Sequence, residues 1–242
     1  MRKRSLFIAA AWLFSASVAA AESGADPAYW TRLLNGEIVA REFDLDGGAG
    51  QADGAEPGAV RMQMLAWAPA RALWDVIVSC QQAFFFIDGL QACEVLEDRG
   101  DRVRVRQVVD QGWLAPRLEF VFESRRQPFE RIDVALLSGN LRALEGRWLF
   151  EETSSGTLVD HALRIRPEVP LPLFLVRRNV EGSMPDLLAC VRALAGGSGS
   201  GQRRASDLAR CRGPAADRLR EATAGSPAPA SELHFQPGAE AE

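Results

Sequence analysis

The chain has 242 residues, of which 47% are hydrophobic and 25% are charged, and this composition is typical of a globular domain with a packed core. The 28 basic and 32 acidic residues give a formal net charge of −4. This balance argues against a nucleic-acid-binding protein, because such proteins present a basic face.

Residues 1–21 have the layout of a secretory signal peptide. The basic start RKR at 2–4 is followed by the apolar run LFIAAAWLF, and Ala19 and Ala21 form an A-x-A cleavage site before Glu22. The alternative, an uncleaved anchor, is disfavoured because a spanning helix needs roughly 20 apolar residues. We expect a soluble periplasmic or secreted protein, whose net charge is about −7 because 25 basic residues remain against 32 acidic ones.

The four cysteines indicate disulfide bonds, since an exported protein folds in an oxidising compartment and their number is even. Three pairings are possible. We favour Cys80–Cys93 and Cys190–Cys211, because each closes a short loop. Free buried thiols are the alternative. A metal site is not expected, because there is no C-x-x-C and the two histidines are far from any cysteine in sequence.

The first part of the mature chain mixes helices, strands and one loop. A short helix over 27–36 is predicted by Asp26 as a cap followed by Pro27. The next expected elements are a strand over 37–45, a glycine-rich loop over 47–58, a strand over 60–67, a helix over 70–80 behind Pro69, and the aromatic stretch QQAFFFIDGLQ at 81–91.

A run of strands follows, and each alternates apolar and polar residues. The expected strands cover 101–109, 117–124, 130–138, 141–152 and 157–166. One-sided patterning of this kind predicts an antiparallel sheet with one solvated face.

A terminal helix is predicted over 173–195. Pro185 should kink or restart it, with Ser183 as a local cap. The segment 197–242 is expected to be a flexible, largely disordered tail unless Cys211 anchors it.

Four segments resemble the START-like superfamily, and more narrowly its coenzyme Q-binding and polyketide cyclase-like branch. They are APARALWDVI at 68–77, FFIDGL at 85–90, CEVLE at 93–97 and PLP at 170–172. The resemblance covers roughly residues 36–196. It implies an α+β helix-grip fold, in which a curved antiparallel sheet wraps around one long C-terminal helix and encloses an apolar cavity. The domain would then span 22–196, between the signal peptide and the tail.

Phe84, Phe85 and Phe86 form the most conspicuous candidate cluster. Three adjacent aromatic residues cannot all face one core, so we expect some of them to line a ligand cavity. The alternative is that they close the end of the sheet as ordinary core residues.

Five further residues lie on the apolar faces of their elements and are predicted cavity walls: Phe120, Phe122, Trp148, His161 and Met184. His161 is either a satisfied wall residue or a polar contact for a ligand carbonyl. It has no acid–base partner on the same face, so no catalytic residue is predicted.

These observations favour a periplasmic protein that binds a hydrophobic lipid-like, quinone-like or polycyclic molecule. The alternatives are a cyclase-like enzyme of the same fold and an interaction module that contacts the envelope membrane or an envelope protein. We expect a monomer without a cofactor.

Overall fold

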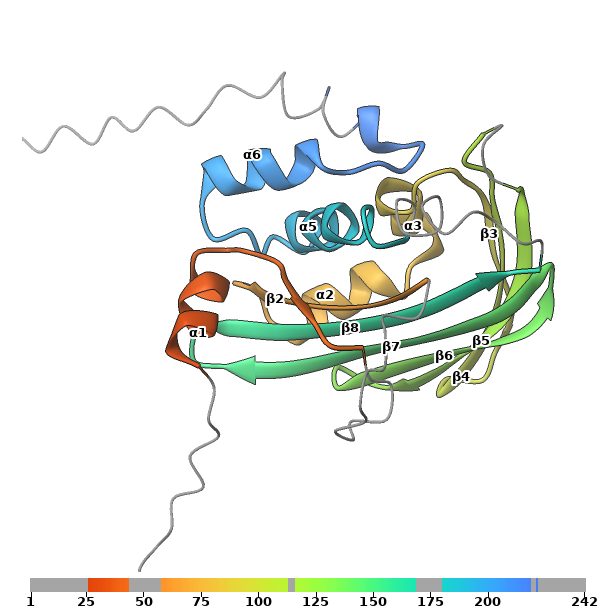
Figure 1. The fold of residues 1–242 in the computed structure, drawn as a ribbon, viewed down its shortest axis with the longest axis horizontal. Coiled ribbons are helices and arrows are strands. Elements are labelled where there is room, and N and C mark those ends of the chain that lie inside the picture. Colours follow the sequence, from red (N-terminus) through yellow and green to blue (C-terminus); the bar gives the residue numbers. More distant parts are fainter. Residues whose placement is uncertain (1–25, 44–57, 113–115, 169–179, 219–220, 222–242) are drawn as a thin grey trace, which may run out of the picture.

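A computed structural model describes residues 26–43, 58–112, 116–168, 180–218 and 221. Within these ranges one antiparallel sheet curls around a group of helices (Figure 1). The helices are α1 Pro27–Leu34, α2 Ala70–Ile77, α3 Cys80–Phe86, α5 Met184–Leu194 and α6 Gly201–Ala209. The strands are β1 Val39–Arg41, β2 Ala59–Ala66, β3 Leu90–Asp98, β4 Arg102–Val109, β5 Leu118–Gln127, β6 Arg131–Gly139, β7 Leu141–Thr153 and β8 Gly156–Pro167.

The sheet has the order β1-β2-β8-β7-β6-β5-β4-β3, and every neighbouring pair is antiparallel. The strands from β3 to β8 follow one another through hairpins. Register shifts occur between Val121 and Phe122 in β5, between Leu141 and Ala143 in β7, and at two places in β3. Such irregularities bend a strand and increase its twist, so they help this sheet to curl.

Helices α2, α3 and α5 lie against the concave face, and α6 lies on the side of α5 that faces away from the sheet (Figure 1). Helix α5 is almost wholly enclosed: Leu188, Ala189, Cys190, Val191 and Ala193 are all 0% exposed. The fold is therefore the predicted α+β helix-grip arrangement, with a curved antiparallel sheet around a terminal helix.

The start of α5 agrees with the expected effect of proline. Pro185 lies in the first turn, where a missing N–H costs no helical hydrogen bond. Ser183 occupies the N-cap position, but its side chain makes no capping hydrogen bond, so the expected side-chain cap is not formed. The earlier part of the predicted helix, residues 173–179, lies outside the described residues. Helix α1 likewise begins as predicted, because the Asp26 carboxylate accepts a hydrogen bond from the Ala28 N–H at 2.9 Å.

Between α2 and β4 the structure contains two elements that periodicity did not predict. Residues 80–86 form α3 and residues 90–98 form β3. Helix α3 has only seven residues, and Ser79 caps its N-terminus, because the Ser79 hydroxyl accepts a hydrogen bond from the Gln82 N–H. Strand β3 is one of the two edge strands of the sheet, and Val95 and Leu96 are about half exposed, so the strand lacks a clean apolar face.

Two disulfide bonds tie helices to their neighbours, in the pairing that the sequence favoured. Cys80 at the start of α3 is bonded to Cys93 in β3, and the two Cα atoms are 5.4 Å apart. Cys190 in α5 is bonded to Cys211 beyond α6, with a Cα–Cα distance of 4.9 Å.

The prediction of a largely disordered segment after residue 196 is wrong for its described part. Ser200 caps α6 by accepting from the Arg203 N–H, and Leu208 and Cys211 are buried against the core. Further on, the Gly213 and Ala215 N–H groups donate to carbonyls of α3 at 3.0 and 2.9 Å.

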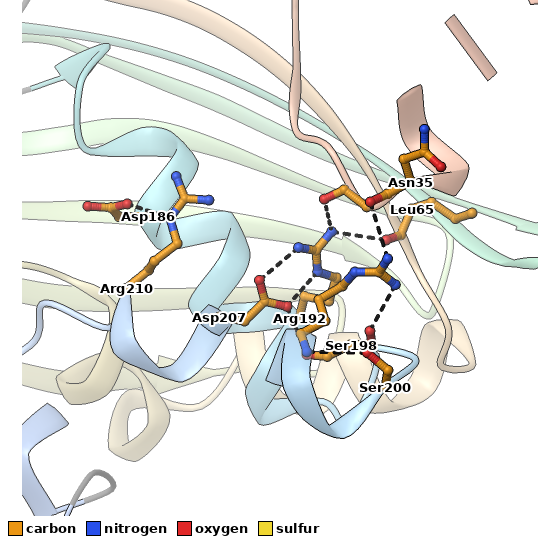
Figure 2. Close-up of polar contacts among 10 residues, drawn as sticks. Asn35, Leu65, Asp186, Arg192, Ser198, Ser200, Asp207 and Arg210 are labelled. Carbon is orange, nitrogen blue, oxygen red and sulfur yellow. Dashed lines mark hydrogen bonds and ion pairs between the residues drawn. The ribbon is translucent and has the colours of Figure 1, made fainter. Parts of the chain in front are cut away.

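A buried ion pair holds α6 in place (Figure 2). Arg192 of α5 donates two hydrogen bonds to the Asp207 carboxylate, at 2.9 and 2.8 Å, and the Ser198 hydroxyl donates a third at 2.8 Å. A terminal nitrogen of the Arg192 guanidinium, Nη1, also donates to the backbone carbonyls of Gly36 and Leu65. The Gly-, Ser- and Arg-rich composition of this segment predicted disorder, because the contacts that order it are made with residues distant in sequence. No helix within the described ranges is long and apolar enough to cross a membrane.

Candidate functional site

A cavity of about 310 Å³ lies between the concave face of the sheet and helices α2, α3 and α5. Its size is within the range of about 300–1,000 Å³ that is usual for small-molecule pockets. Most of its lining is aliphatic or aromatic, and it is formed by side chains from six strands and three helices. The arrangement suits a ligand whose surface is mainly apolar.

Strand β5 provides a continuous line of wall residues. Phe120, Phe122, Ser124 and Arg126 recur at every second position and all line the cavity. Alternate residues of a strand point to the same face, which is why β5 supplies these four residues and also Leu118 at its start. The wall changes along its length from aromatic at Phe120 and Phe122 to polar at Ser124 and Arg126.

A cross-strand row continues the wall from Arg126 across the sheet. Arg126 pairs with Ile132 of β6, Ile132 pairs with Trp148 of β7, and Trp148 pairs with His161 of β8. All four side chains line the cavity. Ser124, Ile132, Trp148 and His161 are buried, whereas Arg126 is partly exposed. This row is called the inner end of the cavity, because the most exposed lining residues, Asp88, Gln111 and Arg212, belong to the other end.

The helices form the opposite wall. Met184 and Leu187 of α5 lie one turn apart, and Ala83 and Phe86 of α3 are likewise three residues apart. Residues at this spacing share a helix face. The helical pattern therefore brings both pairs to the cavity.

The mouth lies at the other end of β5, near Leu118. The exposed lining residues at this end are Asp88, Gln111 and Arg212. Gln111 lies beside Gly89, which follows Asp88 in the chain. Arg212 is followed by Gly213, whose N–H donates to the Phe85 carbonyl of α3. Arg212 donates to Asp186 at 3.1 Å.

His161 is held in one orientation. Its Nδ1 lies 3.0 Å from the Arg147 carbonyl oxygen, and its ring stacks on Trp148 with a centroid distance of 3.6 Å. Since a carbonyl only accepts, Nδ1 carries the proton. Burial lowers the pKa of His161 to about 4, although the bond to Arg147 and the charge of Asp160 act in the opposite direction. At neutral pH the ring is uncharged, and its Nε2 is a hydrogen-bond acceptor.

Of the eight predicted wall residues, six line the cavity: Phe86, Phe120, Phe122, Trp148, His161 and Met184. Phe84 and Phe85 do not. The helical turn of α3 directs Phe86 to the cavity, whereas the backbone carbonyls of Phe84 and Phe85 bond to the segment after α6, and their side chains pack against the core. Phe84 and Phe85 are therefore core residues, which was the alternative to a role in the cavity wall.

Sequence reasoning missed the polar residues of the inner end. The alternation that selected Phe120 and Phe122 continues through Ser124 to Arg126, and this continuation was the available signal. The strand predicted over 117–124 ends at Ser124, so Arg126 lay outside it.

The described lining offers little acid–base chemistry. Asp88 is its single carboxylate and lies at the mouth, away from His161. Among the residues that the structure describes, no three His, Cys, Asp or Glu side chains form a possible metal site.

Comparison with known families identifies the chain. A family model described as polyketide cyclase / dehydrase and lipid transport matches residues 67–192, which is more than half of the sequence. The chain belongs to this family. The START-like resemblance and the fold that it implied are thereby confirmed.

One solved structure with a TM-score above 0.5 shows the same fold, and a second is more weakly similar. A STAR-related lipid transfer protein fragment from Xanthomonas axonopodis has a TM-score of 0.51 and 14% identity, over 66% of this chain and 92% of that one. The Zhui aromatase/cyclase of a Streptomyces species has a TM-score of 0.44 and 19% identity, over 57% and 91% of the two chains. No curated protein matches the sequence.

Proposed function

We propose that this protein is an exported carrier that holds one hydrophobic lipid-like, quinone-like or polycyclic molecule in the cavity. The observation that carries the proposal is the cavity itself, about 310 Å³ in volume and lined mainly by apolar side chains, with Phe120, Phe122 and Trp148 among its walls. Pockets of this size and polarity are typical small-molecule sites.

The energetics set a minimum size for the ligand. A micromolar dissociation constant corresponds to about −8 kcal/mol, and association itself costs roughly 4–15 kcal/mol in lost freedom. At about 25 cal/mol per Å², the ligand and the cavity together must bury roughly 500 Å² of apolar surface or more. A medium-length acyl chain or a small polycycle meets this requirement, whereas a small polar metabolite does not.

Binding is favoured over catalysis by the chemistry of the walls. General acid–base catalysis needs a proton donor and acceptor near the reacting atoms. Among the described residues no carboxylate lies at the inner end with the neutral His161, since Asp88 lies at the mouth. His161 is suited instead to accept a hydrogen bond from a ligand hydroxyl.

Export is supported by the charged and apolar start of the chain and by the two disulfides, which are typical of oxidising compartments. N-terminal sequencing of periplasmic protein from the native host should begin near Glu22. Recovery of Met1 in the membrane fraction would refute this part of the proposal.

The binding proposal is tested by calorimetric titration of the purified, disulfide-bonded protein with dodecanol. We expect one site with a dissociation constant on the order of micromolar. Phe122→Leu should weaken binding several-fold while preserving the circular dichroism spectrum. Leu137→Ala is the control, because Leu137 is 48% exposed and does not line the cavity. Absence of binding to the wild-type protein would contradict the proposal.

A further inference from the structure

We propose that the natural ligand is an amphiphile with a single carboxylate, which Arg126 and Ser124 bind at the inner end of the cavity. The inference rests on the proposed binding function and specifies the class of ligand. The hydrocarbon body would then lie along Phe122 and Phe120 toward the mouth.

The first observation is an arginine without an acidic partner. Among the residues that the structure describes, two arginines line the cavity, and Arg212 at the mouth pairs with Asp186. Arg126 has no carboxylate within ion-pair distance in the described part of the chain, and its one side-chain hydrogen bond runs from Nε to the Ser124 hydroxyl oxygen at 3.3 Å. Both terminal nitrogens of its guanidinium are therefore available to a ligand.

The second observation is the setting of this group. Arg126 is partly buried and lies beside Ile132 on the inner face of the sheet. Burial lowers its pKa, and the more distant charge of Asp98 only partly opposes this effect. Removing a cation from water is costly unless a counter-charge compensates it. An anionic group on the ligand would provide that compensation.

The third observation is the hydroxyl of Ser124. Its side chain is 4% exposed, and its oxygen already accepts the hydrogen bond from Arg126. The hydroxyl proton has no acceptor among the described residues, so it can donate to the same anion. A carboxylate would thus receive two N–H donors from Arg126 and one O–H donor from Ser124.

Charge and volume favour a carboxylate over a phosphate. The guanidinium is a planar fork that matches the two oxygens of a carboxylate. A phosphate monoester carries about −1.5 to −2 charges at neutral pH, which one arginine does not balance. A phosphodiester lipid with two acyl chains would require more room than about 310 Å³.

The test compares three probes with the same twelve-carbon chain: dodecanoate, dodecanol and dodecyl phosphate. Dissociation constants are measured by calorimetry at pH 8, where the carboxylate is ionised. On the wild-type protein, dodecanoate should bind at least ten-fold more tightly than dodecanol, and more tightly than dodecyl phosphate. Arg126→Gln should remove this preference and leave the affinity for dodecanol unchanged, which also shows that the variant is folded.

Arg125→Gln is the matched control. It removes the same charge from the adjacent residue of β5, but the Arg125 side chain is 63% exposed and bonds to Glu123. Its preference for dodecanoate should equal that of the wild type. Arg126→Lys keeps the charge without the fork and should retain part of the preference.

The outcomes separate this inference from the function on which it rests. Equal binding of dodecanoate and dodecanol to the wild-type protein, or an unchanged preference in Arg126→Gln, would show that Arg126 is only a solvent-facing cation. Tighter binding of dodecyl phosphate would overturn the carboxylate assignment. If no probe binds, the carrier function fails as well.

Discussion

Replacing Asp207 with Asn should destabilise the protein far more than the loss of an ordinary ion pair. Asp207 is 3% exposed, and within the described part of the chain it is the one acidic partner of Arg192, which is 2% exposed. The asparagine has nearly the same shape, so packing is preserved while the negative charge is removed. Arg192 is then left charged and buried with only neutral acceptors, which are the carbonyls of Gly36 and Leu65 and the one side-chain oxygen of the introduced asparagine (Figure 2).

The expected cost follows from the burial of the pair. Removing one partner of a buried ion pair typically costs about 3–5 kcal/mol, because the remaining charge stays desolvated. In a domain of this size each kcal/mol shifts the melting temperature by roughly 2–4 °C, so the midpoint should fall by roughly 8–16 °C for a loss near 4 kcal/mol. Because α6 is anchored through Asp207, the loss should be accompanied by increased hydrogen exchange in α6.

Urea unfolding monitored by circular dichroism, with both disulfides intact, measures this cost. The control is Glu37→Gln, which removes a surface pair with Arg32 whose side chains are 48% and 52% exposed. That change should cost less than about 1 kcal/mol. A loss below 1 kcal/mol for Asp207→Asn would refute the reasoning, because it would mean that Arg192 is readily solvated.

Three further predictions concern the disulfide, the buried histidine and the cavity wall. Replacing Cys190 and Cys211 together with Ser should cost about 3 kcal/mol in urea unfolding, since their bond closes a loop with a separation of 21 residues, and an unchanged midpoint would contradict this. The pKa of His161 is about 4 in the folded protein and about 6.5 when unfolded, so between these pH values the unfolded chain binds one more proton than the folded protein. The free energy of unfolding should therefore fall by about 3 kcal/mol as the pH drops from 7 to 4. The variant His161→Gln should lose this part of the pH dependence. Trp148→Leu should weaken dodecanol binding at least as much as Phe122→Leu does. Equal dodecanol affinities in the wild-type protein and both variants would mean that the ligand binds outside the cavity.

The central sheet could be predicted because each of its strands from β4 to β8 has one apolar face. Alternation such as Val103, Val105 in β4 or Ile132, Val134 in β6 is a local signal that does not depend on the partner strand. The helix cover was also predictable from its periodicity, and Pro185 correctly marked where α5 begins.

Elements stabilised by distant contacts were not predictable in the same way. Helix α3 is too short to show a helical period, and it is fixed by the Cys80–Cys93 bond. Helix α6 has a polar sequence and is held by Arg192, fifteen residues away in sequence, and by the bond of Cys211. Local propensity contains no information about such partners.

The candidate site followed a similar division. Apolar faces correctly located Phe120, Phe122, Trp148, His161 and Met184 at the cavity. The aromatic run at 84–86 gave one wall residue of three, because its helical conformation was not recognised. Arg126 was missed because an arginine near the end of a strand usually faces water, and only the enclosed space beside it distinguishes this one.

The most direct test of the account is the position of a bound ligand, measured by isotope-filtered NMR on the protein with dodecanol or dodecanoate. Contacts should connect the acyl chain to the methyl groups of Met184 and Leu187 and to the ring of Trp148, which face one another across the cavity. Contacts restricted to the exposed apolar residues Val95 and Leu96 would instead place the ligand on the edge strand and contradict the proposal of an enclosed binding site.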